Sequence, residues 1–563
     1  MTEIDQTMYV YEQSERNNMS GYATHVVSNQ PPPFEDFNAW HMDVPLREAV
    51  SAFGADWAQP RLAACGARVG STSVQALARL ANRFTPELRT HDRYGHRIDQ
   101  VEFHPAWHEL LGLLRADEVH ALGWTEARVG AHVARAALSY LWAQGEAGVG
   151  CPAAMTFASL GALRHTPEVL ARFQAQILSP LYDPSPIPPG QKPALTVAMA
   201  MTEKQGGSDL RQITTEAVPA GGRLYALTGH KWFFSVPTAD LFLTLARTPA
   251  GPTCFLAQGW RDDGRRNQLL IQRLKEKCGN RSNASSEVEF RGLEAQIIGE
   301  EGRGIATILE TAHLTRLDCA LGSAGQMRQA VRLALHHARH RSAFGQPLVE
   351  QPAMANVLAD LALESEAATW LAMRAAAALD ASRRNENELI LSRILAPLAK
   401  YWVCKRTPVV IAEALECHGG NGFVEEHDIS RLYRDAPLNG LWEGSGNVIC
   451  LDVIRALTRA PESAALLRAE IARAKGEHSA LDMWLATPLP SADERNARRL
   501  TEQLALALVA SLLLRYAPIE VATAYCATRL NHSGWYALGT LPENVALNDV
   551  ISRAVPHEMG AYA

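Results

Sequence analysis

Met201-Thr202-Glu203-Lys204-Gln205-Gly206-Gly207-Ser208-Asp209 is the densest group of small and polar residues in this chain. It stands where the sequence pattern changes from helical to extended. Two neighbouring glycines would let backbone N–H groups come close to a flat or anionic ligand, and Thr202 and Ser208 add hydroxyl donors. The same residues could instead form a Gly-rich turn capped by Ser and Asp side chains. No helix and no later acidic ribose partner are evident, so this is not a GxGxxG dinucleotide-binding fingerprint.

The residues before this cluster have a helical pattern. From about residue 45 to 180 the chain is rich in alanine, and apolar residues recur at helical spacing, as at Val129 and Val133. Residues 1–28 are largely polar and are followed by three prolines, which is typical of a mobile tail. We therefore expect a disordered tail over residues 1–28 and a helical domain over residues 29–194.

The hydrophobic pattern is extended before residue 302 and helical after it. Over residues 195–302, short apolar runs alternate with turns that contain Gly and Pro, which predicts an antiparallel sheet or a small barrel. Helical spacing then returns, and it predicts a bundle over residues 303–458 and a further helical domain over residues 459–563. The three longest helical stretches are residues 305–342, 352–381 and 387–417. The predicted fold class is α+β, mostly α.

Two more clusters of small and polar residues lie in the second half of the chain. Residues 416–423 end a helical stretch, and their glycines could simply terminate a helix. Residues 441–447 precede an apolar helix, which Ser445 or Asn447 could cap. Alternatively, Glu443 is a carboxylate beside an aromatic ring on a turn that leaves room for a ligand. In a dry site such a carboxylate could be a general base with a raised pKa.

These clusters together resemble the acyl-CoA dehydrogenase flavoprotein family. Residues 200–209 look like the first signature of the family, although Gln212 stands where a small residue is usual. Residues 416–435 match the second signature throughout. Residues 231–235 sit where the β domain of the family stacks on the flavin, and residues 341–345 resemble the segment that reaches FAD in a neighbouring subunit.

A closer similarity is to the AidB-like branch of this family, which belongs to the adaptive response to DNA alkylation. The segments that carry it are residues 202–208, 229–236, 279–284, 316–322 and 442–447 and the tail past 459. The family resemblance covers residues 45–460 in the expected order. It implies the acyl-CoA dehydrogenase fold, in which a helical domain, an antiparallel β domain and a helical bundle follow one another, here with an extra C-terminal helical domain.

The resemblance implies FAD as the cofactor and a cofactor site that is shared between subunits of a homotetramer. Thr202 and Ser208 would bond to the isoalloxazine, and Phe233 would flank the ring. Arg341 would approach the adenosine half from a neighbouring subunit. The residues implied to bind FAD are Met201, Thr202, Gly207, Ser208, Phe233, Ser235, Arg341, Phe344, Glu416, Gly420, Trp442, Ser445 and Asn447.

The resemblance also implies the chemistry, which is α,β-dehydrogenation of an acyl-CoA thioester. Glu443 occupies the position of the catalytic base, and Arg316 matches an arginine behind the active site. The base would remove the α-proton while hydride passes from the β-carbon to the flavin. Two alternatives stay open: a metabolic acyl-CoA dehydrogenase without a DNA role, and a flavin-bound scaffold with no turnover.

Composition describes an ordinary globular protein. The 563 residues are 47% hydrophobic and 20% charged, with a formal net charge of −6, which argues against a disordered, fibrous or uniformly basic protein. The nine cysteines are scattered and form no CxxC pair, which favours free thiols over a disulfide framework or zinc site. The first residues offer no signal-peptide pattern. The expected location is the cytoplasm.

The proposal that DNA is a partner comes from the resemblance and not from charge. Residues 461–563 contain nine Lys/Arg and eleven Asp/Glu, a net charge of −2. Arg495, Arg498 and Arg499 form the tightest basic group and are the candidate phosphate contacts, although such groups are most often only solvated. Without a zinc-finger or basic-zipper pattern, binding to double-stranded DNA would be sequence-nonspecific.

Two further features have plain interpretations. His336 and His340 lie one helical turn apart and could hold a metal, but no third ligand is at hand, so we expect a solvated basic face and no metal site. The apolar run of residues 504–514 is too short for a membrane span of about 20 residues and predicts a buried helix.

Overall fold

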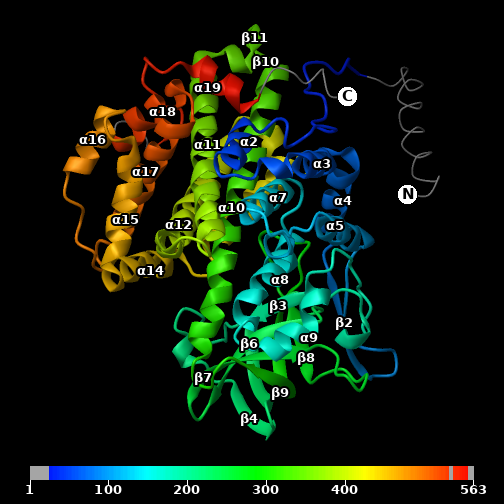
Figure 1. Ribbon diagram of the computed structural model, residues 1–563. Coiled ribbons are helices and arrows are strands. Elements are labelled where there is room, and N and C mark those ends of the chain that lie inside the picture. The colour runs from blue at the N-terminus through cyan, green and yellow to red at the C-terminus, as the bar shows by residue number, and fades with distance from the viewer. Residues whose placement is uncertain (1–23, 532–536, 556–563) are drawn as a thin grey trace.

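The computed structural model describes residues 24–531 and 537–555, so residues 1–23 of the expected tail lie outside the described part of the chain. The molecule consists mainly of helices, with a β domain at one end (Figure 1). The helices before the β domain are α2 (Val44–Ala52), α3 (Gln59–Gly70), α4 (Thr72–Arg83), α5 (Pro105–Ala116), α6 (Leu122–Thr125), α7 (Ala131–Gly145), α8 (Gly150–Leu163) and α9 (Pro167–Ile177).

Asp43 joins the start of α2 to the central helix of the molecule. Its side chain accepts a hydrogen bond from the backbone N–H of Leu46 at 3.1 Å, which caps α2. The same fully buried carboxylate lies 3.2 Å from Arg328 and 3.3 Å from Arg332 of α10 (Gly304–His340). Because a buried carboxylate is costly unless it is paired, these two arginines fix the start of α2 against α10.

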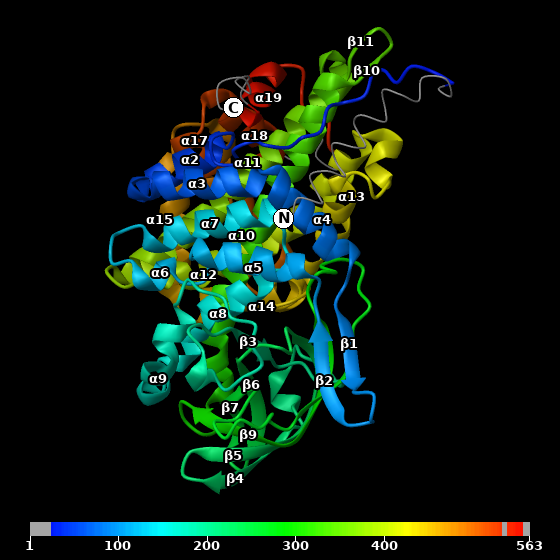
Figure 2. The same cartoon turned by 90° about the vertical axis from the view of Figure 1, so that its right-hand side faces the viewer.

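The expectation of helix throughout residues 45–180 is wrong for one segment. Strands β1 (Glu87–His91) and β2 (Arg97–Glu102) form an antiparallel hairpin that extends toward the β domain (Figure 2). The turn is set by Asp92, whose carboxylate accepts from the backbone N–H of Tyr94 at 2.8 Å. Strand β2 also reaches the β domain, where Arg97 donates to the carbonyl of Ile271 at 2.8 Å.

The β domain is a nearly closed sheet. Its strands are β3 (Val197–Ala200), β4 (Glu216–Gly221), β5 (Leu224–Ser235), β6 (Leu241–Thr248), β7 (Gly251–Gln258), β8 (Leu269–Leu274) and β9 (Ser285–Ile298). The strand order β3-β6-β4-β5-β9-β7 closes through an additional β6–β7 pairing, so the small-barrel alternative fits better than an open sheet. The sequence predicts an antiparallel sheet. The observed sheet is mixed, because β3 and β4 each pair with β6 in parallel.

The bundle is built on three long helices. They are α10, α11 (Pro352–Ala381) and α12 (Glu386–Glu416), within a few residues of the predicted stretches. The short strands β10 (Ser342–Ala343) and β11 (Gln346–Pro347) follow α10, and α13 (Asp428–Asp435) and α14 (Gly446–Arg459) follow α12. Helix α10 runs from the β domain to the opposite end of the molecule, where β10 and β11 lie (Figure 1). Together with the β domain, this confirms the predicted fold class.

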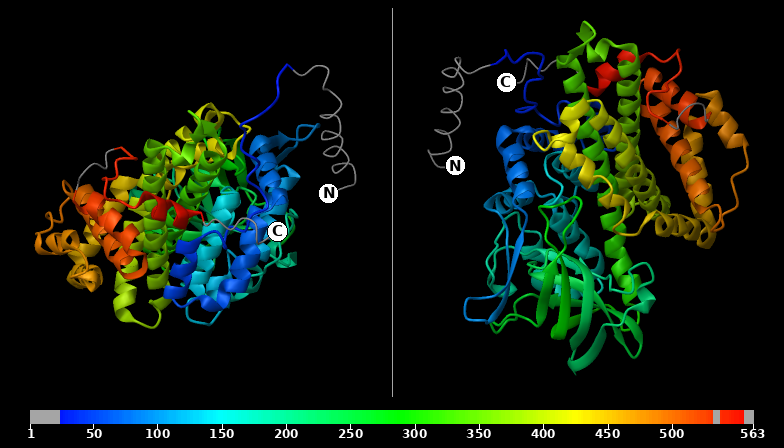
Figure 3. Two further views of the ribbon diagram at one scale, coloured as in Figure 1. Left: turned by 90° about the horizontal axis from the view of Figure 1, so that it is seen from above. Right: turned by 180° about the vertical axis from the view of Figure 1, so that it is seen from behind.

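The described part of the chain after α14, called here the extension, consists mainly of helices as expected, while residues 532–536 and 556–563 of the predicted domain lie outside the described residues. Its helices are α15 (Pro461–Ile471), α16 (Ser479–Ala486), α17 (Ala497–Tyr516), α18 (Ile519–Tyr525) and α19 (Leu547–Ala554), with a π turn at Cys526–Leu530. It packs along α11 and α12 of the bundle, and its last helix, α19, also reaches α2, where Arg553 is paired with Glu48 (Figure 3). The apolar run of residues 504–514 lies in α17 and is mostly buried. Among the helices of the described residues, none combines the length and apolarity that a membrane span requires.

The expected solvated face of histidines is wrong for His336. Its side chain is 8% exposed, its Nε2 lies 2.8 Å from the carbonyl oxygen of Pro32, and its ring is 4.9 Å from that of Phe34. Only His340 of the pair is exposed. The segment before α2 therefore covers this turn of α10. No group of three or more His, Cys, Asp and Glu suited to a metal occurs among the residues that the structure describes.

Candidate active site

Glu443 lies on the turn that leads into α14, in a conformation that is rare for a glutamate. Its φ is 57°, in the left-handed region, and Gly444 follows with a φ of 106°. The Oε2 atom of Glu443 is buried and has no hydrogen-bond partner among the described residues. A strained backbone and an unpaired buried carboxylate oxygen are both costly, and such features gather at functional sites. Glu443 is thus the centre of the candidate site.

Two cations hold this turn through its backbone. Arg316 of α10 donates from Nε to the carbonyl oxygen of Glu443 at 3.0 Å, and its Nη2 is 2.9 Å from Asp452. The Nζ of Lys400, on α12, donates to the carbonyl oxygen of Gly444. Because both bonds go to main-chain oxygens, they fix the position of the Glu443 side chain without neutralising it directly.

The environment of Glu443 favours the protonated carboxyl. Burial raises its pKa above the ordinary value, while a hydrogen bond from Thr315 and the charges of Arg316 and Lys400 lower it. The net direction is upward, as expected from the sequence for a base in a dry site. A carboxylate with a raised pKa binds a proton more readily, which suits a general base.

The cluster of residues 201–209 leaves β3 and is held by a buried ion pair. The side chains of Glu203 and Lys231 are both fully buried, with 2.8 Å between Oε1 and Nζ. Glu203 also accepts hydrogen bonds from the backbone and side chain of Thr215. The backbone N–H of Trp232 donates to the carbonyl of Thr202 at 2.8 Å, which ties the loop to β5. Burial opposes the charge on Glu203, but Lys231 lowers the pKa of this carboxyl well below its usual range.

Strand β5 presents Phe233 and Ser235 on one face. Phe233 is 53% exposed, whereas Phe234 is fully buried, as the alternation of a strand requires. Ser235 contacts the thiol of Cys151, at the start of α8, and this thiol also lies near Asn283 and within the field of Glu443. These contacts bring the predicted flavin face of β5 and the candidate base to the same region of the molecule.

Several residues of this region were not predicted from the sequence. Burial raises the pKa of the Cys151 thiol to about 12, so it is neutral. Burial also lowers the pKa of Lys277 to about 8, and its Nζ lies 3.2 Å from the hydroxyl of Ser285. Glu203 lies within the quoted cluster, but its partner Lys231 is distant in the chain. No local sequence pattern joins these residues, because each contact spans two or more elements.

Trp442, Ser445 and Asn447 flank the base, but neither proposed cap is made. The indole N–H of Trp442 donates to Asn439 at 2.8 Å. Ser445 occupies the N-cap position of α14 without a side-chain hydrogen bond. Asn447 accepts a hydrogen bond at its Oδ1 from the Nε of Arg498, at 2.7 Å. The helix-cap interpretation is therefore wrong for both side chains.

A second group of predicted cofactor residues lies at the far end of the bundle. Arg341 directly follows α10, Glu416 is the last residue of α12, and Gly420 lies in the turn after it. The ends of α10 and α12 are in contact, because the rings of His337 and His418 are 4.8 Å apart. Arg341 is about 25 residues beyond Arg316, which corresponds to about 37 Å along the helix. The residues of this far group therefore cannot reach the Glu443 turn of the same chain.

Phe344 belongs to this far group. It sits at the tip between β10 and β11, is 97% exposed and has a φ of 52°. A large apolar side chain held outward at a strained turn contributes nothing to the packing of its own chain. This exposure is what a residue that contacts a neighbouring subunit would show.

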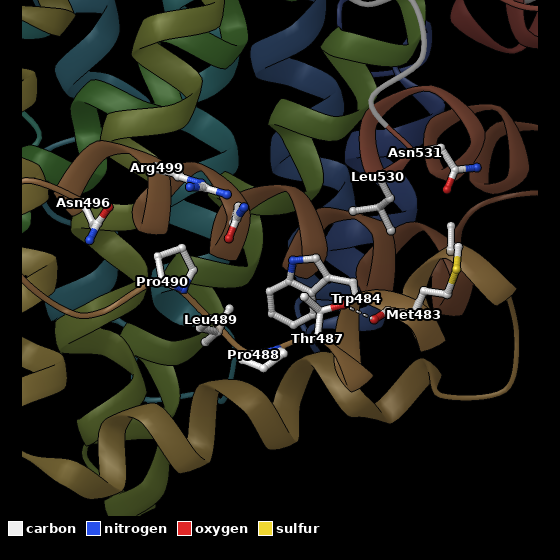
Figure 4. Close-up of a pocket in the computed structure, with 12 residues that line it drawn as sticks. Met483, Trp484, Thr487, Pro488, Leu489, Pro490, Asn496, Arg499, Leu530 and Asn531 are labelled. Atoms are coloured by element: carbon white, nitrogen blue, oxygen red, sulfur yellow. Dashed lines mark hydrogen bonds between the residues drawn. The ribbon is translucent and has the colours of Figure 1, made fainter.

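The three arginines predicted to contact DNA do not share one environment. Arg495, Arg498 and Arg499 are all exposed around the start of α17, but Arg498 is bonded to Asn447. Arg499 instead lines a cavity of about 480 Å³ within the extension, opposite Trp484 (Figure 4). Arg498 therefore contacts the candidate active site, whereas Arg499 faces a cavity of the extension itself.

Three family models match the chain in series. They are the adaptive response protein AidB N-terminal domain (residues 29–184), the acyl-CoA dehydrogenase middle domain (residues 198–293) and the acyl-CoA dehydrogenase C-terminal domain (residues 302–458). The chain is also 43% identical to the AidB protein of Escherichia coli (strain K12) over 95% of its own length and 98% of that protein. The chain belongs to the acyl-CoA dehydrogenase family. Within this family it is AidB-like, as predicted.

Solved structures with the acyl-CoA dehydrogenase fold are also similar to this chain. Caenorhabditis elegans ACDH-11, in complex with C11-CoA, has a TM-score of 0.83 and 25% identity, and the match covers 91% of this chain and 95% of that chain. An acyl-CoA dehydrogenase from Bacillus anthracis complexed with FAD has a TM-score of 0.62 at 17% identity, covering 80% and 86%, and supports the fold alone. Family membership confirms the prediction of an FAD-dependent oxidoreductase.

Proposed function

We propose that this protein oxidises acyl-CoA thioesters, with Glu443 as the base that removes the α-proton. The observation that carries the proposal is the buried Oε2 of Glu443, which has no partner within the described residues and stands on a turn fixed by Arg316 and Lys400. An unpaired oxygen of this kind is free to accept a proton from a bound ligand. The hydroxyls of Thr202 and Ser208 and the open ring of Phe233 fit a flat cofactor such as FAD.

In this mechanism the chain positions the substrate and moves one proton. Oε2 of Glu443 accepts the proton from the α-carbon, and the raised pKa of the carboxyl stabilises the protonated product. FAD, when bound, would accept the hydride from the β-carbon, so that a carbon–carbon double bond forms. Arg316 and Lys400 keep the backbone of the turn in place while the side chain changes its charge.

The proposal predicts how the reaction depends on pH. Glu443 acts only when it is deprotonated, so the rate of flavin bleaching by an acyl-CoA should rise with pH and level off above the pKa of Glu443. Because burial raises this pKa, the midpoint should lie above the ordinary value of 4.5. Anaerobic mixing of the holoprotein with acyl-CoA at a series of pH values measures it. A midpoint at or below 4.5, or no bleaching at any pH, would contradict the proposal.

We also propose that the cofactor site is completed by a second copy of the chain. The far group of Arg341, Phe344, Glu416 and Gly420 would contact the FAD of a neighbouring subunit, because it lies too far from the Glu443 turn of its own chain. The outward position of Phe344 supports this assignment. A homotetramer, made from two such pairs, is the assembly we propose.

A second proposed function is nonspecific binding of double-stranded DNA as part of protection against alkylation. The similarity to AidB supports it, since that match covers 95% of the chain and so includes most of the extension. Arg495 and Arg499 are exposed on the extension and are available for phosphate contacts. The alternative is a metabolic acyl-CoA dehydrogenase, in which the extension serves only the protein itself.

The DNA proposal makes a prediction about salt. Retention of duplex DNA should weaken as salt rises, because each phosphate contact releases counterions. Replacing Arg499 with Ala should weaken binding for all sequences and reduce the slope of log K against log salt by about 1. Arg93→Ala, on the exposed β1–β2 turn, is the charge-matched control. DNA retention that is absent at low salt, or independent of salt, would leave the metabolic alternative.

A further inference from the structure

The extension makes a direct polar contact with the turn that carries the candidate base. Arg498 lies in the first turn of α17, and its Nε donates to the Oδ1 of Asn447 at 2.7 Å. Asn447 is four residues beyond Glu443 and belongs to the first turn of α14. The contact joins residues 51 positions apart in the chain.

A second observation places the guanidinium of Arg498 against the same turn. A Cβ atom added to Gly446 would lie 3.5 Å from Nη2 of Arg498 and 3.0 Å from Cε of Lys405 on α12. Two cationic side chains thus stand against the first residue of α14, where a side chain larger than hydrogen would press on them. The N-cap residue Ser445 makes no side-chain bond here. Asn447 is therefore oriented from the extension and not by a local cap.

The backbone that carries Arg498 is itself firmly held. Its neighbours Ala497, Leu500 and Thr501 are at most 4% exposed, and the hydroxyl of Thr501 donates to the carbonyl of Ala497 at 2.7 Å. A donor on a well-packed helix can fix the rotamer of its acceptor, whereas one on a loose segment would cost entropy. The first turn of α17 therefore suits a positioning role.

We infer that Arg498 is a positioning residue of the cofactor site and not a contact for DNA. It holds the amide of Asn447 in the orientation in which Asn447 would meet FAD, so the extension takes part in retaining the cofactor. This inference rests on the proposed function and on the contact with FAD that the family resemblance implies for Asn447. It also assigns the extension a role that does not depend on DNA.

The test measures release of FAD from the holoprotein after dilution, followed by the fluorescence of the free flavin. Arg498→Ala should release FAD about tenfold faster than the wild type, as expected for the loss of one charge-assisted hydrogen bond at a partly screened site. Arg498→Lys keeps the charge but loses the directed Nε donor, so it should not restore wild-type release. Lys475→Ala removes one exposed positive charge from the same extension and should release FAD at the wild-type rate.

A double-mutant cycle makes the assignment specific. If Arg498 acts through Asn447, then adding Arg498→Ala to Asn447→Ala should cause no further loss of FAD. Additive losses, a wild-type release rate in Arg498→Ala, or full rescue by lysine would each overturn the positioning role. A wild-type protein that retains no FAD would instead contradict the proposed function. The two failures are therefore distinguishable.

Discussion

Replacing Glu443 with Gln should lower the rate of acyl-CoA-dependent flavin bleaching by about 10²–10⁴-fold, the range that general-base catalysis contributes. The bound flavin should keep its absorbance spectrum. Gln matches Glu in size and shape but cannot take up a proton at neutral pH. The substitution therefore removes the proposed chemistry and leaves the volume of the site unchanged.

The structure explains why this variant should still fold and bind FAD. Arg316 and Lys400 hold the turn through the carbonyl oxygens of Glu443 and Gly444, and both oxygens belong to the main chain. The left-handed φ of residue 443 is no less favourable for Gln than for Glu. Removing a buried carboxylate that lacks a full set of partners should even relieve some desolvation cost.

Stopped-flow mixing with acyl-CoA under anaerobic conditions gives the rate, and the flavin content of the purified variant gives retention. Glu301→Gln, an exposed glutamate on the turn before α10, serves as the matched control and should react like the wild type. Bleaching at an undiminished rate in Glu443→Gln would exclude Glu443 as the base. Loss of flavin from the variant would mean that Glu443 has a structural role as well.

The helices were the part of the fold most open to prediction from sequence. The stretches 305–342, 352–381 and 387–417 coincide with α10, α11 and α12 to within a few residues, because a long helix repeats its apolar period many times. The hairpin β1–β2 was missed, since its strands have five and six residues and are stabilised by contacts with the β domain. Parallel pairing of β3 and β4 with β6 is likewise set by tertiary packing, which no local pattern reports.

Site residues that belong to a sequence motif could be predicted, but the side chains that they contact could not. Glu443 and the cluster of residues 201–209 stand out in the sequence. In contrast, Lys231 is identified as the partner of Glu203 only once β5 lies beside the loop. Arg498 illustrates the opposite case, in which a residue noticed for its charge lies against a different site from the one expected. Sequence motifs identify which residues can bind or react, whereas the packing of α17 on α14 determines that Arg498 contacts Asn447.

Arg529→Ala should destabilise the attachment of the extension by about 3–5 kcal/mol, the cost of removing one partner from a buried ion pair. Arg529 is 1% exposed and lies on the π turn after α18. It donates to Glu364 at 2.9 and 3.0 Å and also to Asp360, both on α11. Without it, two buried carboxylates one helical turn apart would lose their shared cation.

The remaining partners would compensate only in part. Glu364 would keep Arg406, whose Nε is 2.9 Å from Oε2, and Asp360 would keep the backbone N–H of Gly539 at 2.8 Å. A matched control is Arg473→Ala in the same extension, because Arg473 is 58% exposed and its ion pair with Glu470 is 3.4 Å long. Glu470 is buried but would keep Arg374 and Arg515, so the loss of this exposed arginine should cost less than about 1 kcal/mol. Urea unfolding, with hydrogen exchange of α17 and α18, would compare the two variants.

The dependence of this effect on pH separates an electrostatic cause from lost packing. Burial opposes the charge on Glu364, but Arg406 and Arg529 lower its pKa below the usual 4.5. A lowered pKa in the folded state stabilises the fold above the unfolded pKa, and this stabilisation is lost as the pH falls through the folded value. The difference between wild type and Arg529→Ala should therefore be largest near neutral pH and shrink below pH 4.5. A difference that stays constant across this range would mean that Arg529 stabilises the extension through packing of its side chain and not through its charge.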